Sequence, residues 1–352
     1  MSHTPVTDRR SGSFLGEVKD AVTPRATLLV LGVIALQLLF IASYVGALHD
    51  PKPKDVPFGV VAPPAAAERT VSRLERLPGS PLDPRTVADA ESARRQIENR
   101  EIDGALIVGP GGTEDTLLVA SGGGTVLATS LEGLVAKVEK AEGRTVRTVD
   151  VAPASPRDFD GLSSFYLVVG WCVGGYLCAS ILAISTGARP ANPRRAAIRL
   201  IVMALVSIVG GLGGAVIVGP ILGALPGSVV DLWGLGALIT FAVGAATLAL
   251  QGVFGIVGIG LAILLVVIAG NPSAGGAFPL PMLPPFWREI GPWLPPGAGT
   301  WAARSIAYFK GNDTTVSLLL LWAWAVAGTV ITILAAALRR RRQEAELPTQ
   351  AD

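Results

Sequence analysis

The sequence has few of the residues on which soluble enzymes and secreted domains depend. It holds two histidines and two cysteines in 352 residues, and 16% of its residues are charged. His3 lies in a polar tail and His49 at a predicted helix end, so we expect no histidine-based catalytic or metal site. Cys172 and Cys178 lie inside an apolar run, which excludes the disulfide framework of a small secreted domain and favours a packing role.

Motifs for nucleotide hydrolysis and nucleophilic catalysis are also missing. No GxxxxGK[ST] motif occurs, so we interpret the glycines at 110–112 and 121–124 as turns. The serines of GLSSF (161–165) lack a G-x-S-x-G context and a histidine partner, and we expect them to cap a helix. The net charge of +2 offers no basic field for nucleic acid. We therefore predict a protein that is not an enzyme and has no cofactor, no metal ion and no nucleic-acid partner.

Long apolar runs are abundant instead. Half of the residues are hydrophobic and the mean hydropathy is +0.53, which is typical of a chain with several membrane spans. A hydrocarbon core of about 30 Å takes roughly 20 helical residues to cross. We predict six transmembrane helices, at 27–48, 163–186, 199–221, 232–250, 253–270 and 316–338. Only Gln251 and Gly252 separate the fourth helix from the fifth, so we predict a tight hairpin there.

Basic residues predict the orientation of these helices. Four Lys or Arg residues lie in the N-terminal tail (1–26), four in the loop after the second helix and four in the C-terminal tail (339–352). Because loops rich in Lys and Arg stay in the cytoplasm, six spans place both termini inside and 49–160 outside. The first run is long and lacks a convincing cleavage site, so we interpret it as an uncleaved anchor in the plasma membrane.

The outer region 49–160 alternates between strand-like and helix-like patterns. We expect strands at DVPFGVVAP, GALIVG, DTLLVAS and RTVRTVDVAP, and helices at AAAERTVSRLERL, ADAESARRQIENREI and GTVLATSLEGLVAKVEK. This alternation favours a small α/β domain, and about a hundred residues can bury a core. The predicted fold is a polytopic α-helical membrane protein with six transmembrane helices and an extracytoplasmic α/β domain between the first two.

A segment rich in proline and aromatic residues (271–312) follows the fifth predicted helix, within a five-helix block at 163–338. We expect Pro272 to end that helix and Gly275 and Gly276 to form a flexible joint. Two short interfacial helices are then expected in 278–309, with Trp301 and Phe309 near lipid and Arg304 towards polar groups. A plain proline-rich loop is the alternative. The predicted outer gate consists of Gly275, Gly276, Phe278, Pro279, Trp287, Trp293, Trp301 and Arg304.

Three further features have two interpretations each. Gly210 and Gly214 have GxxxG spacing, which lets helices approach closely either within one subunit or across a homodimer. Arg194 and Arg195 are a candidate docking site for a separate cytoplasmic ATPase, or they only set the topology. Gln251 either forms hydrogen bonds between helices or contacts a substrate.

The stretch GNPSAGGAFPLPMLPPFWREIGPWLPPGAGTWAARSIAYFKGN (270–312) resembles the penultimate loop of ABC-2-type membrane proteins. It is most similar to the phage infection protein (Pip/YhgE) branch, in which G-N-x-S-x-G-G-x-F-P is followed by L-P. The layout is similar too, with one span, an outer insert containing REIDGALIV, and then five spans, although many relatives have a much longer helical insert.

The resemblance implies a permease-like membrane protein that is associated with export, usually dimeric and served by a separate ATPase. We therefore expect export of an unknown substrate across the bacterial plasma membrane. The alternative is a non-transporting envelope protein whose outer domain binds a partner or assists secretion.

Overall fold

A computed structural model describes residues 23–109, 111 and 113–346. The ends of both predicted cytoplasmic tails, 1–22 and 347–352, and two residues of the predicted turn at 110–112 lie outside this part. The chain divides into two compact units, Met1–Ala42 and Ser43–Asp352. Helix α2 (Pro24–Leu48) begins in the first unit, and its segment Ala26–Leu48 is apolar and 23 residues long, enough to cross a membrane.

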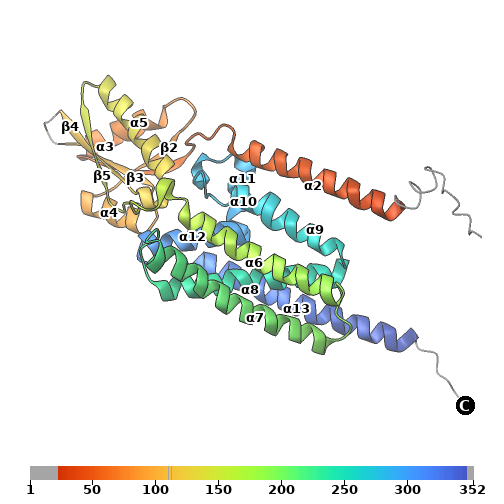
Figure 1. Cartoon of the computed structure of the whole chain (residues 1–352). Coiled ribbons are helices and arrows are strands. Elements are labelled where there is room, and N and C mark those ends of the chain that lie inside the picture. The colour runs from red at the N-terminus through yellow and green to blue at the C-terminus, as the bar shows by residue number, and fades with distance from the viewer. Residues whose placement is uncertain (1–22, 110, 112, 347–352) are drawn as a thin grey trace, which may run out of the picture. The chain divides into compact units, whose positions relative to one another are not determined.

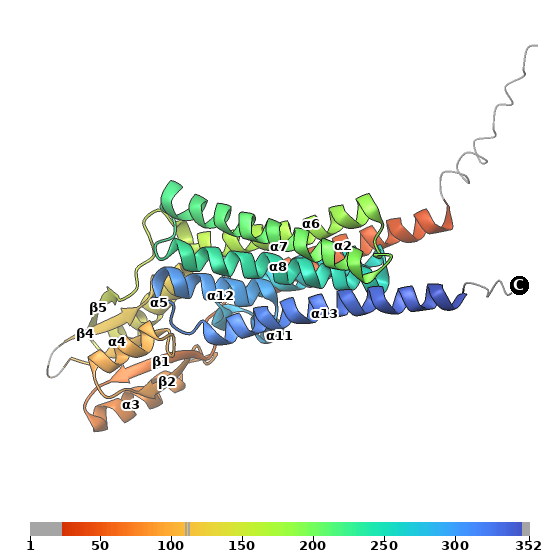
Figure 2. The same cartoon turned by 90° about the horizontal axis from the view of Figure 1, so that it is seen from below.

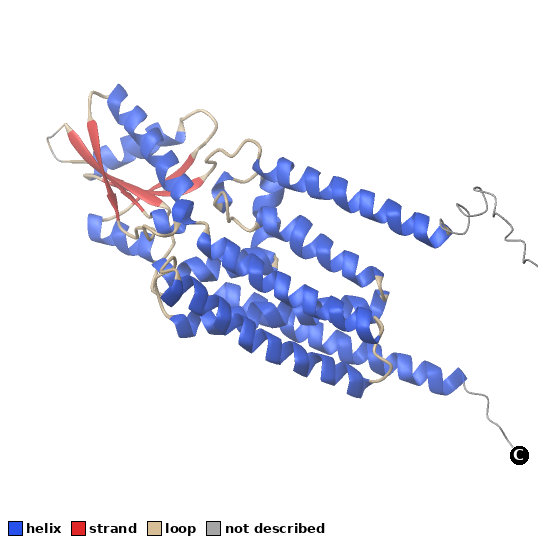
Figure 3. Cartoon of the chain, in the orientation of Figure 1, coloured by secondary structure: helices blue, strands red, loops and turns tan. Residues whose placement is uncertain are grey.

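The second unit begins with the predicted α/β domain, which Figure 3 shows as the one group of strands in the described chain. Its mixed five-stranded sheet has the order β2-β1-β3-β4-β5, in which only β3 and β4 pair antiparallel. The strands are β1 (Val56–Val61), β2 (Leu82–Thr86), β3 (Gly104–Ile107), β4 (Glu114–Val119) and β5 (Thr145–Asp150), and the helices are α3 (Pro64–Glu75), α4 (Ala90–Glu98) and α5 (Thr125–Ala141).

Each face of the sheet is covered by helices because its central strands are apolar on both sides. Phe58 of β1 and Leu117 of β4 pack against α3 and α5 on one face. Ala105 of β3 and Leu118 of β4 pack against α4 on the other. Successive side chains of a strand point to opposite faces, so these short apolar strands supply two cores at once.

Strand β2 (Leu82–Thr86) is the one element of the domain that the sequence pattern did not predict. Its sequence LDPRT has no run of β-branched or aromatic residues and contains Pro84. The strand lies at the edge of the sheet and pairs only with β1. Proline is tolerated there because an edge strand can leave one side without ladder hydrogen bonds.

Five helices of the described chain are long and apolar enough to cross a membrane. Besides α2 they are α6 (Ser163–Thr186), α7 (Pro193–Val216, extended by π-helical turns to Ile221), α8 (Val229–Phe254) and α13 (Thr315–Glu346). They correspond to the predicted first, second, third, fourth and sixth spans. The serines of GLSSF do not cap α6 as predicted, because the Asp158 carboxylate accepts the Ser163 backbone N–H at 2.7 Å instead.

The predicted fifth span is shorter than the others. Helix α8 stops at a left-handed Gly255, and the chain turns into an apolar helix, Val257–Ser273, of 17 residues. It consists of α9 (Val257–Ile263), a π-helical stretch (Leu264–Gly270) and α10 (Asn271–Ser273). Seventeen residues at 1.5 Å each span about 25 Å, less than a hydrocarbon core of about 30 Å. The hairpin itself is confirmed, because a Cβ at Gly258 would lie less than 3.0 Å from the Leu250 backbone.

Two ends of the helical bundle can be distinguished within the second unit (Figure 1). At the domain end, next to the α/β domain, α6, α8 and α13 begin. At the distal end, Arg189 after α6 donates to the Val253 carbonyl of α8 at 3.0 Å, and Arg339 of α13 donates to the Arg189 carbonyl at 3.4 Å.

Two shorter helices, α11 (Pro285–Ile290) and α12 (Pro295–Tyr308), lie between α10 and α13 in sequence. Figures 1 and 2 both show α12 beside α8 and α13. Its small residues Ala298, Ala302 and Ala303 share a core with Val168 of α6 and Ile239 of α8. Small side chains let α12 insert between longer helices rather than lie on their surface.

Candidate functional site

A cavity of about 490 Å³ lies where the α/β domain meets α12 and the segment 274–292. We call it the junction cavity. Its volume is typical of small-molecule sites, roughly 300–1,000 Å³. Its charged lining residues are Arg100, Asp103, Arg288, Glu289, Arg304 and Asp313, and most of the other lining residues are proline, glycine or apolar.

Arg304 of α12 holds the segment that borders this cavity. Its side chain is buried, with 4% of its surface exposed. The guanidinium donates to the carbonyls of Gly275 and Gly276, each at 2.7 Å, and to the carbonyl of Gly161 at 3.3 Å. Gly275 has a φ of 69°, a conformation that favours glycine. In this conformation its carbonyl accepts the hydrogen bond from the Arg304 guanidinium. One side chain thus holds the chain after α10 to the chain before α6.

Arg100 approaches the same cavity from the α/β domain. It follows α4 with a φ of 62°, which is uncommon for a residue other than glycine. Its Nη1 donates to the Trp301 carbonyl at 2.9 Å and to Ser305 Oγ at 2.7 Å. The guanidinium carbon lies 3.3 Å from the centroid of the Trp301 ring, a cation–π contact. Arg100 therefore connects the domain to α12.

The two arginines that hold the junction together, Arg100 and Arg304, form hydrogen bonds but no ion pairs within the described residues. All five hydrogen bonds of the Arg100 and Arg304 guanidiniums go to neutral oxygens, and within 23–109 and 113–346 neither forms an ion pair. Burial and the field of Arg304 lower the pKa of Arg100 to about 9. Burial raises the pKa of Asp103 to about 6, although Arg100 and Arg288 oppose this shift. The cavity thus combines cations that stay charged at neutral pH with a carboxyl that titrates slightly below it.

The segment 274–292 also completes the core of the α/β domain. Met282 is buried in the cluster around Phe58, and Phe278 packs against that cluster. The Lys54 backbone N–H donates to the Pro281 carbonyl at 2.9 Å, and Arg288 donates to the Lys54 carbonyl at 3.0 Å. The domain and the segment therefore form one packed body.

The aromatic residues of the predicted gate occupy different environments. Trp293 is 68% exposed, whereas Trp287 and Trp301 are partly buried. Trp301 Nε1 donates to the Asp313 carboxylate at 3.1 Å. Pro279 is buried against Gly124, where a Cβ would lie less than 3.0 Å from its ring. Of the predicted set, the structure brings Gly275, Pro279, Trp301 and Arg304 together around the junction cavity.

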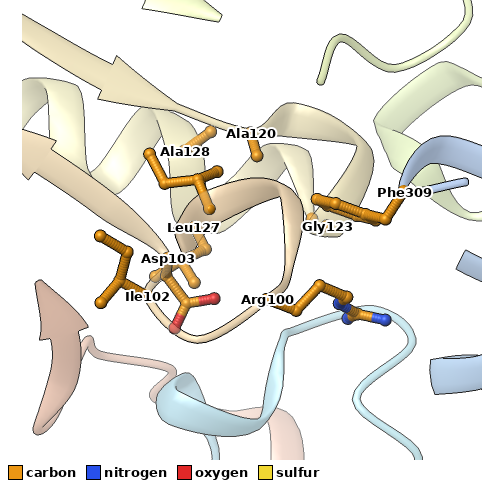
Figure 4. A pocket seen from close by; sticks show the side chains of 10 residues that line it. Arg100, Ile102, Asp103, Ala120, Gly123, Leu127, Ala128 and Phe309 are labelled. Atoms are coloured by element: carbon orange, nitrogen blue, oxygen red, sulfur yellow. The ribbon is translucent and has the colours of Figure 1, made fainter. Parts of the chain in front are cut away.

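The second predicted interfacial helix requires a correction. All residues of α12 except Trp301, Ile306 and Tyr308 are buried, so this helix does not lie on the surface. Phe309 does not face lipid either, since 4% of it is exposed and its ring centroid lies 4.9 Å from the Arg100 guanidinium carbon. Figure 4 shows Phe309, Arg100 and Asp103 around a smaller neighbouring pocket. The amphipathic pattern of α12 reflects contacts with the α/β domain and α13, which a helical wheel does not show.

At the distal end, two of the four loop arginines stabilise helix ends. Arg199 is buried and donates to the Gly187 carbonyl at 2.6 Å, and Arg189 caps α8 through Val253. Arg194 and Arg195 are exposed at the first turn of α7, where the helix dipole disfavours positive charge. Their side chains make no hydrogen bond or ion pair within the described residues, so they are accessible to a partner.

The two glycines of the GxxxG pattern have different surroundings. A Cβ at Gly214 would lie 2.5 Å from Nε1 of Trp171, so Gly214 permits the close contact of α7 with α6 inside one subunit. A Cβ at Gly210 would meet nothing within 4 Å, although its carbonyl accepts a hydrogen bond from Trp171 at 3.2 Å. Gly211, which the pattern did not single out, is the residue that lies against the backbone of α8.

Other candidates form no second site. Gln251 is fully buried, yet neither polar atom of its amide has a hydrogen-bond partner among the described residues. Cys172 and Cys178 are free thiols six residues apart on α6. Within the described residues no group of three or more His, Cys, Asp or Glu side chains could hold a metal ion.

The sequence pattern did not identify Arg100 and Asp103, the two charged residues that the α/β domain contributes to the cavity. Both lie in the motif REIDGALIV, where a charged turn before a buried strand is unremarkable. The left-handed conformation of Arg100 could not be inferred from its residue type, so no local signal identified it.

Comparison with known proteins identifies no relative of this chain. No family model matches this chain, and no curated protein or solved structure matches it.

Proposed function

We propose that this protein is a permease-like membrane protein that exports a substrate across the bacterial plasma membrane, with the junction cavity on the exit route. The observation that supports this best is the interrupted helical path from Val257 to Tyr308, which borders the cavity. In transporters, interrupted helices mark substrate sites, because free backbone groups at membrane depth are tolerated only where protein or a polar cavity surrounds them. The resemblance of 270–312 to ABC-2-type permeases points to the same class.

In this proposal the chain crosses the membrane six times and both termini are cytoplasmic. The short helix Val257–Ser273 makes the fifth crossing, together with the local thinning of the bilayer that short helices require. The positive charges of 187–199 and 339–342 gather at the distal end, which is consistent with a cytoplasmic location for that end. The α/β domain then lies outside.

A separate cytoplasmic ATPase would supply the energy, since the sequence has no P-loop of its own. Arg194 and Arg195 are the proposed docking residues, because they are exposed and their side chains make no hydrogen bond or ion pair within the described chain. A homodimer is also proposed, with Gly210 of α7 on an open helix face.

The outer gate is proposed to include the segment from Gly275 to Trp293. Because Arg304 holds the carbonyls of Gly275 and Gly276, opening requires this clamp to release. The exposed Trp293 and the partly buried Trp287 would anchor the segment at headgroup depth.

The test compares cells that express the protein with cells that express the Trp287→Ser/Trp293→Ser double variant. Mass spectrometry of the culture medium should detect a compound that the wild-type protein exports and the double variant exports less, at equal membrane abundance. Tyr166→Ser, an exposed aromatic on α6 outside the cavity, is the matched control and should export normally. Identical media from wild-type, double-variant and empty-vector cells would refute export and favour a non-transporting envelope protein.

A further inference from the structure

The junction cavity carries a charge pattern that points to a class of ligand. Its partly or fully buried charges are Arg100, Arg288, Arg304 and Asp103, whereas Glu289 and Asp313 are exposed to solvent. Exposed carboxylates are strongly screened by water and contribute little to the field inside a cavity. The less exposed lining is therefore positive, with three guanidiniums against one carboxyl.

These guanidiniums have unused hydrogen-bond donors. Each guanidinium carries five N–H groups. Both hydrogen bonds of Arg100 leave from Nη1, and the buried Nε of Arg304 has no partner among the described residues. Asp158 attracts Arg304, and Asp103 and Asp313 attract Arg100, without forming a direct ion pair. A buried cation that lacks such a pair is costly, and an anion that accepts several N–H groups would offset that cost.

The surroundings of the cavity point to an amphiphile. Val316 lines it and is 72% exposed, and Leu319 lies one turn further along α13 and is also exposed. Trp293 is exposed beside the lining residue Pro292. An apolar surface that leads away from a cationic cavity fits a molecule with an anionic head and an apolar chain, as basic pockets between membrane helices fit anionic lipid headgroups.

We propose that the junction cavity binds the phosphodiester group of an anionic amphiphile, and that Arg100 and Arg304 donate hydrogen bonds to its two non-bridging oxygens. Planar guanidiniums match this geometry better than ammonium groups do. The inference rests on the proposed function only for the claim that the bound molecule is exported. Binding itself requires neither transport nor an ATPase.

Asp103 should make ligand binding depend on pH in a defined direction. The charged groups around it are Arg100 on its own turn, Arg288 and Glu289 of α11, Arg304 of α12 and Asp313 before α13. Its pKa is about 6, so it is ionised at pH 7.5 and competes with the ligand for the guanidiniums. Protonation removes this competition, and a phosphodiester stays ionised throughout, so binding should strengthen as the pH falls through about 6.

The experiment uses the full-length protein in micelles and counts bound molecules by native mass spectrometry. The probes are phosphatidylglycerol, its deacylated headgroup glycerophosphoglycerol, and zwitterionic phosphatidylcholine. We expect phosphatidylglycerol to bind and phosphatidylcholine to bind at least about tenfold more weakly, since its charges cancel. The binding of glycerophosphoglycerol shows whether the phosphodiester belongs to a lipid or to a soluble molecule. Equal binding of the headgroup would assign the site to a soluble phosphodiester, and weaker binding would assign it to a lipid.

Asp103→Asn is the decisive variant, because its side chain makes no hydrogen bond within the described residues and the change should not disturb folding. It should bind phosphatidylglycerol roughly tenfold more tightly at pH 7.5 and lose the pH dependence. Arg100→Gln should bind about tenfold more weakly. Arg85→Gln, which removes the same charge from an exposed position on the edge strand β2 outside the cavity, should bind like the wild type.

Two results would overturn the proposal. One is equal binding of phosphatidylglycerol and phosphatidylcholine at both pH values. The other is an Asp103→Asn variant whose affinity and pH dependence match the wild type. Because no transport is measured, either result leaves the export proposal standing, and a failed export assay leaves the binding result standing.

Discussion

Replacing Arg304 with Gln should release the segment that follows α10. The change removes the donor to the carbonyls of Gly275, Gly276 and Gly161, all of which lie in the buried interior. A buried acceptor that loses its partner costs about 1–3 kcal/mol, so three such losses amount to roughly 3–9 kcal/mol. Against this, removing a buried guanidinium recovers a desolvation penalty of several kcal/mol. We expect a net loss of about 3 kcal/mol, the low end of that range, because this recovery and the one carbonyl that the shorter Gln amide can still satisfy both reduce the loss.

Hydrogen exchange measured by mass spectrometry locates this effect. A local loss of about 3 kcal/mol raises the opening equilibrium about 150-fold, so amides of 272–282 should exchange correspondingly faster. Amides of the sheet should exchange as in the wild type. Arg288→Gln is the matched control, because Arg288 is partly exposed and its side chain donates a single hydrogen bond within the described residues, to the Lys54 carbonyl. Unchanged exchange in 272–282, or an equal effect of the control, would show that Arg304 does not clamp this segment.

Three further predictions concern other parts of the chain. Gly258→Ala should destabilise the protein by about 2 kcal/mol in thermal unfolding, because its Cβ would meet the backbone of α8, whereas Gly260→Ala meets nothing within 4 Å and should be neutral or stabilising. A cysteine at the exposed Lys140 should react with a membrane-impermeant maleimide in intact cells, and labelling only after lysis would invert the proposed orientation. The Arg194→Gln/Arg195→Gln variant should insert normally but lose co-purification with an ATPase, and retained association would rule out docking there.

The sequence alone determined much of the secondary structure. Periodicity predicted β1, β3, β4 and β5 and the three helices of the α/β domain, because each buries an apolar stripe with its own repeat. Hydropathy predicted the five long apolar helices, because crossing a membrane demands an uninterrupted run. Neither pattern predicted β2, because this strand is placed by its pairing with β1 rather than by its own residues.

Only the tertiary structure decided what the segment between α9 and α13 does. Its prolines and aromatics predicted two short interfacial helices, but α12 is buried in the bundle and Met282 completes a core that begins at Val56. Contacts between residues more than two hundred positions apart, such as Arg100 with Trp301, leave no period in the sequence. The sequence determined which segments are helix, strand or span, because local backbone and solvent preferences decide that. The sequence could not predict the cavity, because its charged residues come from two segments that are far apart in the sequence and meet only in the folded protein.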